Sequence, residues 1–351
     1  MHWTEINTTL LDNFRGGLVI PAHPLALNSS REFDITRQRA LTRYYVDAGS
    51  GGLAVGVHTT QFAIRDVGLY TPVLELAAQT AADWANRPLF MVAGVAGPTG
   101  QAIREAETAR ALGYQAVLLS LAALKTSSED ELIDHCRTVA DVMPVIGFYL
   151  QTAVGGRRLT RGFWRRFAQI ENVIGIKMAP FNRYATLDVI RGVVEARAED
   201  RVSLYTGNDD HIVLDLVSHY RIQRDSKPVD MKISGGLLGH WSVWTRGAVD
   251  ILGRCKKAQA SGEAKEDILR LDSAVTDCNA AVFDVANDFQ GVIAGCHEIL
   301  RRQGLLEGRW CLDPEEDLGP GQSEELDRIY NEYPEFNDDA FVAENLSRWL
   351  A

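Results

Sequence analysis

The sequence lacks several patterns that would assign it at once to a structural or functional class. Its five cysteines are odd in number and scattered, and no pair has the C-x-x-C spacing that zinc sites use. Neither a disulfide framework nor a zinc site is therefore expected, and the thiols should be reduced. The chain also has no early G-x-G-x-x-G turn, which argues against a dinucleotide-binding fold.

Long apolar runs and long basic runs are absent as well. The longest apolar stretches, such as PLFMVAGVAG, are far shorter than the roughly eighteen residues that a membrane helix needs. The opening segment MHWTEINTTLLDNFRGG does not have the layout of a signal peptide, so we expect a cytoplasmic protein without a membrane partner. A formal net charge of −11 without a basic run argues against nucleic acid as a partner.

Short apolar runs bounded by glycine or turn residues recur eight times, with helical spacing between them. In the helical segment that begins SSEDEL, Ser127 or Ser128 can act as the cap. Eight strands alternating with helices over roughly 235 residues predict an α/β fold, a (β/α)₈ TIM barrel, and fit an open sheet less well. The predicted strands cover residues 16–23, 52–57, 89–95, 116–121, 144–150, 173–179, 203–208 and 235–243.

After residue 245 the pattern is helical only. We therefore expect a barrel over residues 1–250 that carries the active site, and a C-terminal helical extension over 251–351 packed on it. Residues 309–336 mix acidic residues with Pro and Gly, which predicts a loop leading to a last helix that ends at Trp349. Residues 219–232 predict an excursion before the eighth strand. The roles of this excursion and of the tail after 309 stay open.

One lysine, Lys177, stands in the run ENVIGIKMAP, which otherwise reads as a buried strand. Burying an unpaired ammonium group costs several kcal/mol, and a lowered pKa avoids this cost by leaving a neutral, nucleophilic amine. Alternatively, Lys177 reaches water at the strand end or pairs with a carboxylate such as Asp209. Tyr149 lies at the same end of the preceding strand, 28 residues earlier, so we expect adjacent strands to bring an amine and a phenol together. Tyr149 can also be an ordinary core phenol.

A neutral lysine amine can attack a ketone and form an imine, which acts as an electron sink for making or breaking the neighbouring C–C bond. The reaction needs a proton shuttle, and a tyrosine can serve. The turn HTTQF at residues 58–62 can supply N–H groups and hydroxyls for a substrate carboxylate, although a Thr-Thr pair is also ordinary turn chemistry.

Six segments in order resemble the dihydrodipicolinate synthase and N-acetylneuraminate lyase family, whose members are class I aldolases on a (β/α)₈ barrel with C-terminal helices. The resemblance spans residues 15 to 305. It implies that Lys177 is the imine-forming lysine and that Tyr149 is the proton-relaying tyrosine, at the family's separation of 28 residues. The segments are GVHTTQF, VAGVAGPTGQAIREAETARALGYQAVLLS, VIGFYL, VIGIKMAP, YTGNDD and GGLLGHWSV.

The resemblance also implies a substrate site. Thr59 and Thr60 match the turn that holds the oxo-acid carboxylate, and Gly207 and Trp241 fall where the family lines its pocket with backbone. No metal or organic cofactor is implied, because the lysine itself supplies the electron sink. Relatives are usually tetramers built of dimers, so the resemblance implies a homodimer or homotetramer.

The sequence departs from the synthases at specific positions. Val154 stands where they carry an arginine for the aldehyde's carboxylate, Ala123 where they lend a tyrosine to a neighbouring subunit, and Leu150 replaces the asparagine after the catalytic tyrosine. Losing the arginine costs several kcal/mol of binding, so aspartate semialdehyde is not the expected partner and the acceptor pocket should be roomier and more apolar. His58 and His240 are candidates for substrate recognition, and each can equally be structural.

We therefore expect a Schiff-base lyase or aldolase that uses pyruvate or a related 2-oxo acid with an aldehyde or sugar acid, or that dehydrates a sugar acid. The alternative is a non-catalytic relative that binds a small oxo acid or sugar acid. A metal-dependent barrel aldolase would need ligands at several strand ends, and only GNDDH at 207–211 offers a cluster.

Overall fold

Eight parallel strands form a barrel, which confirms the predicted fold class. The computed structural model describes residues 1–351, and the strands follow the order β1-β10-β7-β6-β5-β4-β3-β2. The barrel closes where Ala22 bridges Ala54 and the His23 amide donates to the Ala54 carbonyl at 2.8 Å. Each predicted strand segment contains one of these strands: β1 (Val19–Pro21), β2 (Gly52–Val55), β3 (Phe90–Val95), β4 (Ala116–Leu119), β5 (Val145–Leu150), β6 (Val173–Ala179), β7 (Ser203–Thr206) and β10 (Gly235–Leu238).

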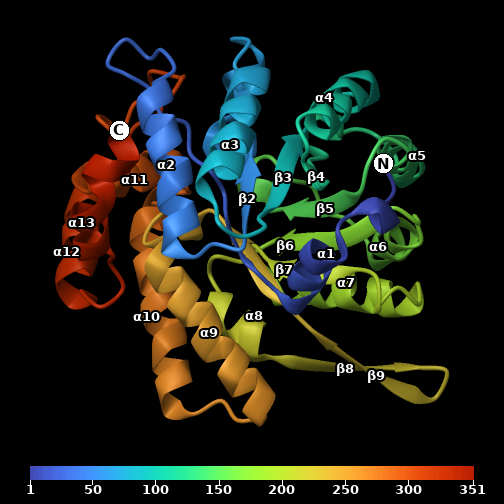
Figure 1. Cartoon of the computed structure of the whole chain (residues 1–351). Helices are drawn as coiled ribbons and strands as arrows, with labels where there is room; N and C mark the ends of the chain where they lie inside the picture. Colours follow the sequence, from blue (N-terminus) through green and yellow to red (C-terminus); the bar gives the residue numbers. More distant parts are fainter.

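A helix follows every barrel strand and packs on the outside of the barrel (Figure 1). The helix after β4 begins with a capping box, in which Ser128 accepts the Glu131 amide and the Glu131 carboxylate accepts the Ser128 amide. The sequence allowed either Ser127 or Ser128 as the cap, and in the structure the cap is Ser128. These helices are α2 (Ile35–Ala48), α3 (Tyr70–Trp84), α4 (Thr99–Ala111), α5 (Glu129–Ala140), α6 (Arg161–Ala168), α7 (Arg183–Glu195), α8 (Ile212–Val217) and α9 (Thr245–Ser261).

The amino end of the barrel is filled by α1 (Thr8–Gly16). Phe14 on this helix stacks on Phe90 and Tyr205, with ring centroids 4.5 and 4.7 Å away. The Tyr205 hydroxyl donates to the Phe14 carbonyl at 2.6 Å. Aromatic packing thus closes this end, which leaves the opposite end for a site.

The excursion at 219–232 is a two-stranded antiparallel hairpin of β8 (His219–Arg224) and β9 (Lys227–Lys232), and it projects from the barrel (Figure 1). Asp225 and Ser226 form its turn with φ of 52° and 63°, as a type I′ turn requires. Arg224, at the turn end of β8, holds the tip of the hairpin through an ion pair with Glu199 at 2.7 Å.

Four further helices follow the barrel along one side of the molecule (Figure 1): α10 (Glu266–Val282), α11 (Val292–Arg302), α12 (Gln322–Glu332) and α13 (Asp339–Leu350). Two details correct the predictions. The expected boundary at residue 250 falls inside α9, the eighth barrel helix, and α12 lies inside the segment predicted to be a loop. The last helix ends within one residue of its predicted end. None of the helices combines the length and apolar character needed to cross a membrane.

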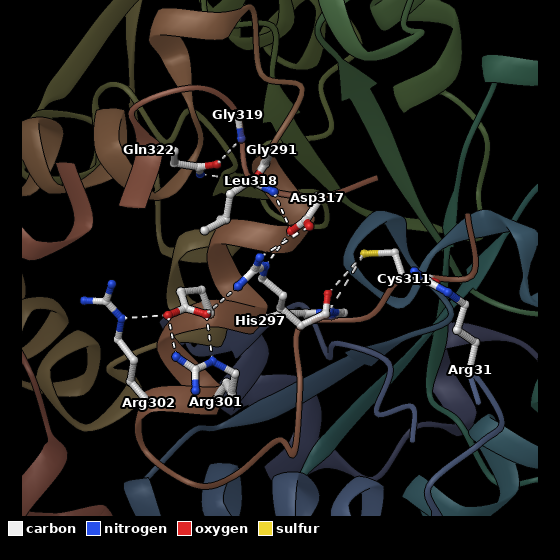
Figure 2. Close-up of polar contacts among 12 residues, drawn as sticks. Arg31, Gly291, His297, Arg301, Arg302, Cys311, Asp317, Leu318, Gly319 and Gln322 are labelled. Atoms are coloured by element: carbon white, nitrogen blue, oxygen red, sulfur yellow. Dashed lines mark hydrogen bonds and ion pairs between the residues drawn. The ribbon is translucent and has the colours of Figure 1, made fainter. Parts of the chain in front are cut away.

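Polar contacts hold the segment between α11 and α12 against the rest of the chain (Figure 2). Arg31 donates to the Cys311 carbonyl, and the Cys311 sulfur lies 3.9 Å from His297 Nδ1. At the start of α12, the Gly319 amide donates to Gln322 Oε1 at 3.0 Å. The tail after residue 309 is therefore an ordered part of the fold.

Candidate active site

A pocket opens at the carboxyl end of the barrel strands, where barrel enzymes have their active sites. Its lining combines apolar side chains with three titratable groups, His58, Lys177 and Asp209. Six strands contribute through residues at or just after their ends: Ala22, Val57, Leu150, Ala179, Gly207 and Gly239. We call this space the barrel-mouth pocket.

Lys177 extends from β6 into the barrel-mouth pocket and is only 7% exposed. Its amine lies 4.5 Å from the centre of the Phe148 ring and has no hydrogen bond or ion pair within the chain. Burial lowers the pKa of this amine below its ordinary value, and the charge of Asp209 opposes the shift. The amine is thus easier to deprotonate than an ordinary lysine, which is what a nucleophile requires.

Gly207 lies beside Lys177 because its amide donates to the Met178 carbonyl of β6 at 2.7 Å. A Cβ at Gly207 would lie 2.6 Å from Lys177 Cε and 3.0 Å from the Ala179 methyl. A glycine is therefore required for the lysine to adopt its position. The structure places Gly207 in the pocket, as the sequence predicts.

Asp209 and His58 share the pocket with Lys177. Burial raises the pKa of the Asp209 carboxyl, and the hydrogen bond from the His240 amide and the charge of Lys177 oppose the shift. Burial, with a smaller contribution from the charge of Lys177, lowers the pKa of His58 to about 4. His58 is thus a neutral imidazole at neutral pH, whereas Lys177 and Asp209 form an electrostatically coupled pair.

The turn that carries Gly207 and Asp209 is fixed by the buried Asn208. The Asn208 side-chain amide donates to Thr186 Oγ1 at 3.1 Å and to Asp215 Oδ2 at 2.9 Å. Its carbonyl oxygen accepts the Phe181 amide at 3.1 Å. The side chain of Asn208 is thus satisfied inside the fold, and its neighbours on both sides face the pocket.

The two threonines of the HTTQF turn differ in their position relative to the pocket and in their hydrogen bonds. Thr59 lines the pocket, and its hydroxyl donates to the Ala22 carbonyl at 2.8 Å. Thr60 lies beneath the pocket surface, accepts the amides of Gly56 and Val57, and donates to the His23 carbonyl at 2.6 Å. Thr60 therefore holds the turn from inside, and its hydroxyl is fully used by the backbone.

Tyr149 is not in the barrel-mouth pocket, and the prediction that it meets Lys177 is wrong. Its ring packs against Trp164 of α6, with centroids 5.2 Å apart. Its hydroxyl donates to the Leu159 carbonyl at 3.3 Å and lines a separate cavity with Arg158 and Asp188. The Tyr149 side chain thus lies on the outer face of β5, against α6.

An irregularity between β5 and β6 explains this placement. Val145 pairs with Val173, but Ile146 pairs with Gly175, so the register shifts by one residue and Phe148 pairs with Lys177. A shift of one residue moves every side chain to the other face of a strand. If the register of Val145 and Val173 continued along both strands, Tyr149 and Lys177, which are 28 residues apart, would be partners. The local composition gives no signal of the shift.

Trp241 is a further predicted site residue that does not line the barrel-mouth pocket. Its ring is buried against Gly236, where a Cβ would lie 2.4 Å from it, and it lines a separate small cavity with Trp244. Gly239, two residues earlier, lines the barrel-mouth pocket instead. The neighbouring His240 has a structural part, because its amide donates to Asp209 Oδ1 at 3.0 Å.

Several apolar residues complete the pocket, and the sequence did not point to most of them. Phe181 follows β6, and its ring meets that of Phe289 edge to face at 5.8 Å. Both residues have positive φ, 49° and 67°, which is uncommon for side chains of this size and is often found at ligand sites. Three lining residues, Phe283, Phe289 and Val292, come from the C-terminal extension. The pocket is therefore built by more than residues 1–250.

No group of three or more His, Cys, Asp or Glu side chains in the structure is arranged to hold a metal ion. In the GNDDH segment, the Asp209 carboxylate accepts a backbone amide, while Asp210 pairs with Arg183 at 3.3 Å. These carboxylates therefore have separate partners.

Comparison with known proteins places the chain in a family. The model of the Dihydrodipicolinate synthetase family matches residues 14–219, which is more than half of the chain. The chain belongs to this family. The match contains the strands that carry Lys177 and the turns that carry Thr59 and Gly207.

Two relatives illustrate the range of the family. N-acetylneuraminate lyase 2 of Escherichia coli O6:H1 is 22% identical over 318 residues, which cover 90% of this chain and 92% of the relative. 4-hydroxy-tetrahydrodipicolinate synthase of Thiobacillus denitrificans is 26% identical over 201 residues, 56% of this chain and 63% of the relative. The named relatives are thus lyases and synthases.

Solved structures agree on the fold. CdNal from Clostridium difficile, in complex with mannosamine, superposes with a TM-score of 0.72 at 15% identity and covers 90% of this chain and 99% of its own. Dihydrodipicolinate synthase from Aquifex aeolicus gives a TM-score of 0.73 at 17% identity, with 91% and 98% covered. At these identities the likeness establishes the barrel with its C-terminal helices.

Proposed function

We propose that this family member is a lyase or aldolase in which Lys177 forms a Schiff base with pyruvate or a related 2-oxo acid. The observation that carries the proposal is the Lys177 amine. It is buried in the pocket at the carboxyl end of the barrel, has no ion pair, and has a pKa lowered by burial. A neutral amine attacks the ketone carbon, and the resulting imine accepts electrons when a neighbouring C–C bond is made or broken.

The surroundings of Lys177 support a role for the Thr59 turn in binding the carboxylate of the oxo acid. The turn carries a buried hydroxyl and backbone N–H groups at the pocket wall, and the Gly207 backbone lies on the other side of the lysine. The acceptor end of the pocket is apolar, with Leu150 and Val154 among its lining residues. We therefore propose an aldehyde or sugar acid that needs no arginine partner for a second carboxylate.

The experiment for this proposal is reductive trapping. The protein is incubated with pyruvate, and separately with larger 2-oxo acids, then reduced with borohydride and weighed by intact-mass spectrometry beside Lys177→Ala. We expect one reduced adduct per chain in the wild type and none in the variant. No adduct with any 2-oxo acid would contradict the proposal and favour the alternative of a non-catalytic oxo-acid or sugar-acid binding protein.

Assembly stays a prediction. The resemblance implies a homodimer or homotetramer, and light scattering coupled to size exclusion measures this directly. A mass of at least twice the 38.8 kDa of one chain is expected, and a mass of one chain at micromolar concentration would contradict it.

A further inference from the structure

The barrel-mouth pocket lacks the phenol that a Schiff-base reaction in this family would be expected to use. Phe148, which has no exchangeable proton, occupies the strand position opposite Lys177, and the side chain of Tyr149 lies on the outer face of β5. Forming an enamine from an imine nevertheless requires a base near the substrate carbon. Another group in the pocket must then move this proton.

Besides Lys177, the titratable side chains that line the pocket are His58 and Asp209. They differ in how well they suit the task. His58 has a pKa lowered to about 4, so its neutral ring is a weak base. Asp209 has a pKa raised by burial, so its carboxylate is a stronger base than an ordinary aspartate.

The hydrogen bonds of Asp209 leave one of its oxygens free. Oδ1 accepts the His240 amide at 3.0 Å, which fixes the carboxyl group, and no other residue donates a hydrogen bond to Oδ2. The hydrogen bonds of the Asn208 side chain fix the backbone directly before Asp209. A carboxylate held on one oxygen and free on the other, in the same pocket as the amine, is positioned for proton transfer.

On this basis, and resting on the proposed function, we propose that Asp209 takes the proton from C3 of the oxo acid bound as an imine to Lys177. The C3–H bond breaks, and its electron pair becomes the C2=C3 bond of the enamine. The π pair of the protonated imine moves to the nitrogen of Lys177, and the proton goes to Oδ2 of Asp209. Without an acceptor, the reverse transfer moves a proton from Oδ2 back to C3 of the enamine. With an acceptor, C3 forms the new C–C bond and the proton on Oδ2 goes to the acceptor's oxygen.

Deuterium exchange into pyruvate tests this step without knowledge of the acceptor. The protein is incubated with pyruvate in D₂O, and loss of the C3 proton signal is followed by NMR for the wild type, Asp209→Asn and Asp210→Asn. Asn at position 209 keeps an oxygen for the His240 amide, so the turn is retained. Asp210 is the matched control, because it lies outside the pocket lining and pairs with Arg183 at the surface.

We expect exchange to fall by about 10²- to 10⁴-fold in Asp209→Asn and to stay within about twofold of the wild type in Asp210→Asn. The acid limb of the wild-type pD profile should also disappear in Asp209→Asn. The groups facing this carboxyl are Lys177, Asp210, the His240 amide and Cys296. Burial raises the pKa of the carboxyl, as does the charge of Asp210, whereas the His240 amide and the charge of Lys177 lower it. A second variant, Phe148→Tyr with Asp209→Asn, should regain part of the exchange, because its phenol would face Lys177.

The controls separate the two proposals. If borohydride traps the adduct on the wild type but Asp209→Asn exchanges as fast as the wild type, the role of Asp209 is overturned and the Schiff base stands. Loss of exchange in His58→Gln with full exchange in Asp209→Asn overturns it as well. Absence of both adduct and exchange in the wild type overturns the proposed function, and with it this inference.

Discussion

The position of Lys177 depends on two neighbours that contribute no charge. The Phe148 ring faces its amine, and the bare Cα of Gly207 leaves room for its chain. A cation interacts favourably with an aromatic face, but this contact is weaker than a carboxylate pair and leaves the amine available once deprotonated. The charge of Asp209 acts through the pocket rather than through an ion pair with Lys177.

Substitution of Gly207 should therefore disturb the lysine specifically. In Gly207→Ala, the new methyl would lie 2.6 Å from Lys177 Cε, so the amine must move. We expect the rate of adduct formation with pyruvate to fall by about 10²-fold, the order expected for a displacement near 1 Å. Gly253→Ala is the matched control, because a Cβ there meets nothing within 4 Å. Equal rates in the two variants would contradict this account.

The pH dependence of adduct formation follows from the direction of the pKa shift. Burial lowers the pKa of Lys177 from the ordinary 10.5, so the neutral amine is present at lower pH than for an exposed lysine. Initial rates of trapping with pyruvate should rise with pH and level off at a midpoint below 10.5. Because the charge of Asp209 raises this pKa, the midpoint should move lower still in Asp209→Asn. A midpoint at or above 10.5, or an upward shift in the variant, would be inconsistent with the site.

At the scale of single residues, the sequence predicted the site residues whose positions depend only on their own strand or turn. Lys177 is an evident exception in an apolar strand, and Gly207 and Thr59 lie in turns with recognisable composition. Tyr149 could not be placed correctly, because its direction depends on a one-residue shift between two strands. Trp241 and Gly239 differ by only two positions in a short helical turn, and packing against Gly236 decides between them.

At the scale of elements, the tail after α11 is attached to the turn that carries Thr59. The Leu312 amide donates to Gln61 Oε1 at 2.6 Å, and Gln61 itself is buried with φ of 66°. The segment therefore supports the pocket wall from behind, although it contributes no side chain to the lining.

Removing this contact should loosen the tail locally. In Gln61→Ala, the Leu312 amide loses its partner, which costs about 1–3 kcal/mol. We expect hydrogen exchange to accelerate over residues 309–318 and in the turn at 58–62, as measured by mass spectrometry. Gln79→Ala, on the exposed face of α3, is the control. Unchanged exchange of both segments in Gln61→Ala would show that the contact does not support the turn.

The regular elements were predictable because the alternation of short apolar runs and amphipathic helices repeats eight times. The elements outside this repeat were harder. The sequence of the hairpin β8–β9 is polar because most of its residues face solvent, so it predicted only an excursion. The sequence did not predict α12, because Pro and Gly residues flank it. Local composition near such residues favours a loop, and tertiary packing of α12 on α10 overrides it.

At the scale of the whole molecule, the C-terminal extension and the barrel share a buried polar contact. Asp338 accepts the Tyr44 hydroxyl of α2 at 2.7 Å, the Arg246 amide of α9 at 3.1 Å, and the Gln303 side-chain amide at 2.7 Å. One carboxylate thus joins the barrel to the last helix. The extension also supplies Phe283 and Phe289 to the pocket.

Loss of this carboxylate should destabilise the whole chain. In Asp338→Ala, the Tyr44 hydroxyl and the Arg246 amide lose their acceptor and Gln303 keeps only its bond to Asp339, so we expect the free energy of unfolding to fall by about 2–5 kcal/mol. Guanidinium denaturation followed by tryptophan fluorescence measures this change. Glu335→Ala, at an exposed position nearby, should stay within about 0.5 kcal/mol of the wild type. A comparable loss in both variants would argue against a specific role for Asp338.

The central claim is that Lys177, among the seven lysines of the chain, forms an imine with a 2-oxo acid. The most direct measurement is peptide mapping by tandem mass spectrometry after reduction of the pyruvate complex with borohydride. We predict a single modified peptide containing ENVIGIKMAP, with the reduced pyruvyl group on Lys177. A modification spread over the surface lysines, or located on another lysine while Lys177 stays free, would contradict the account.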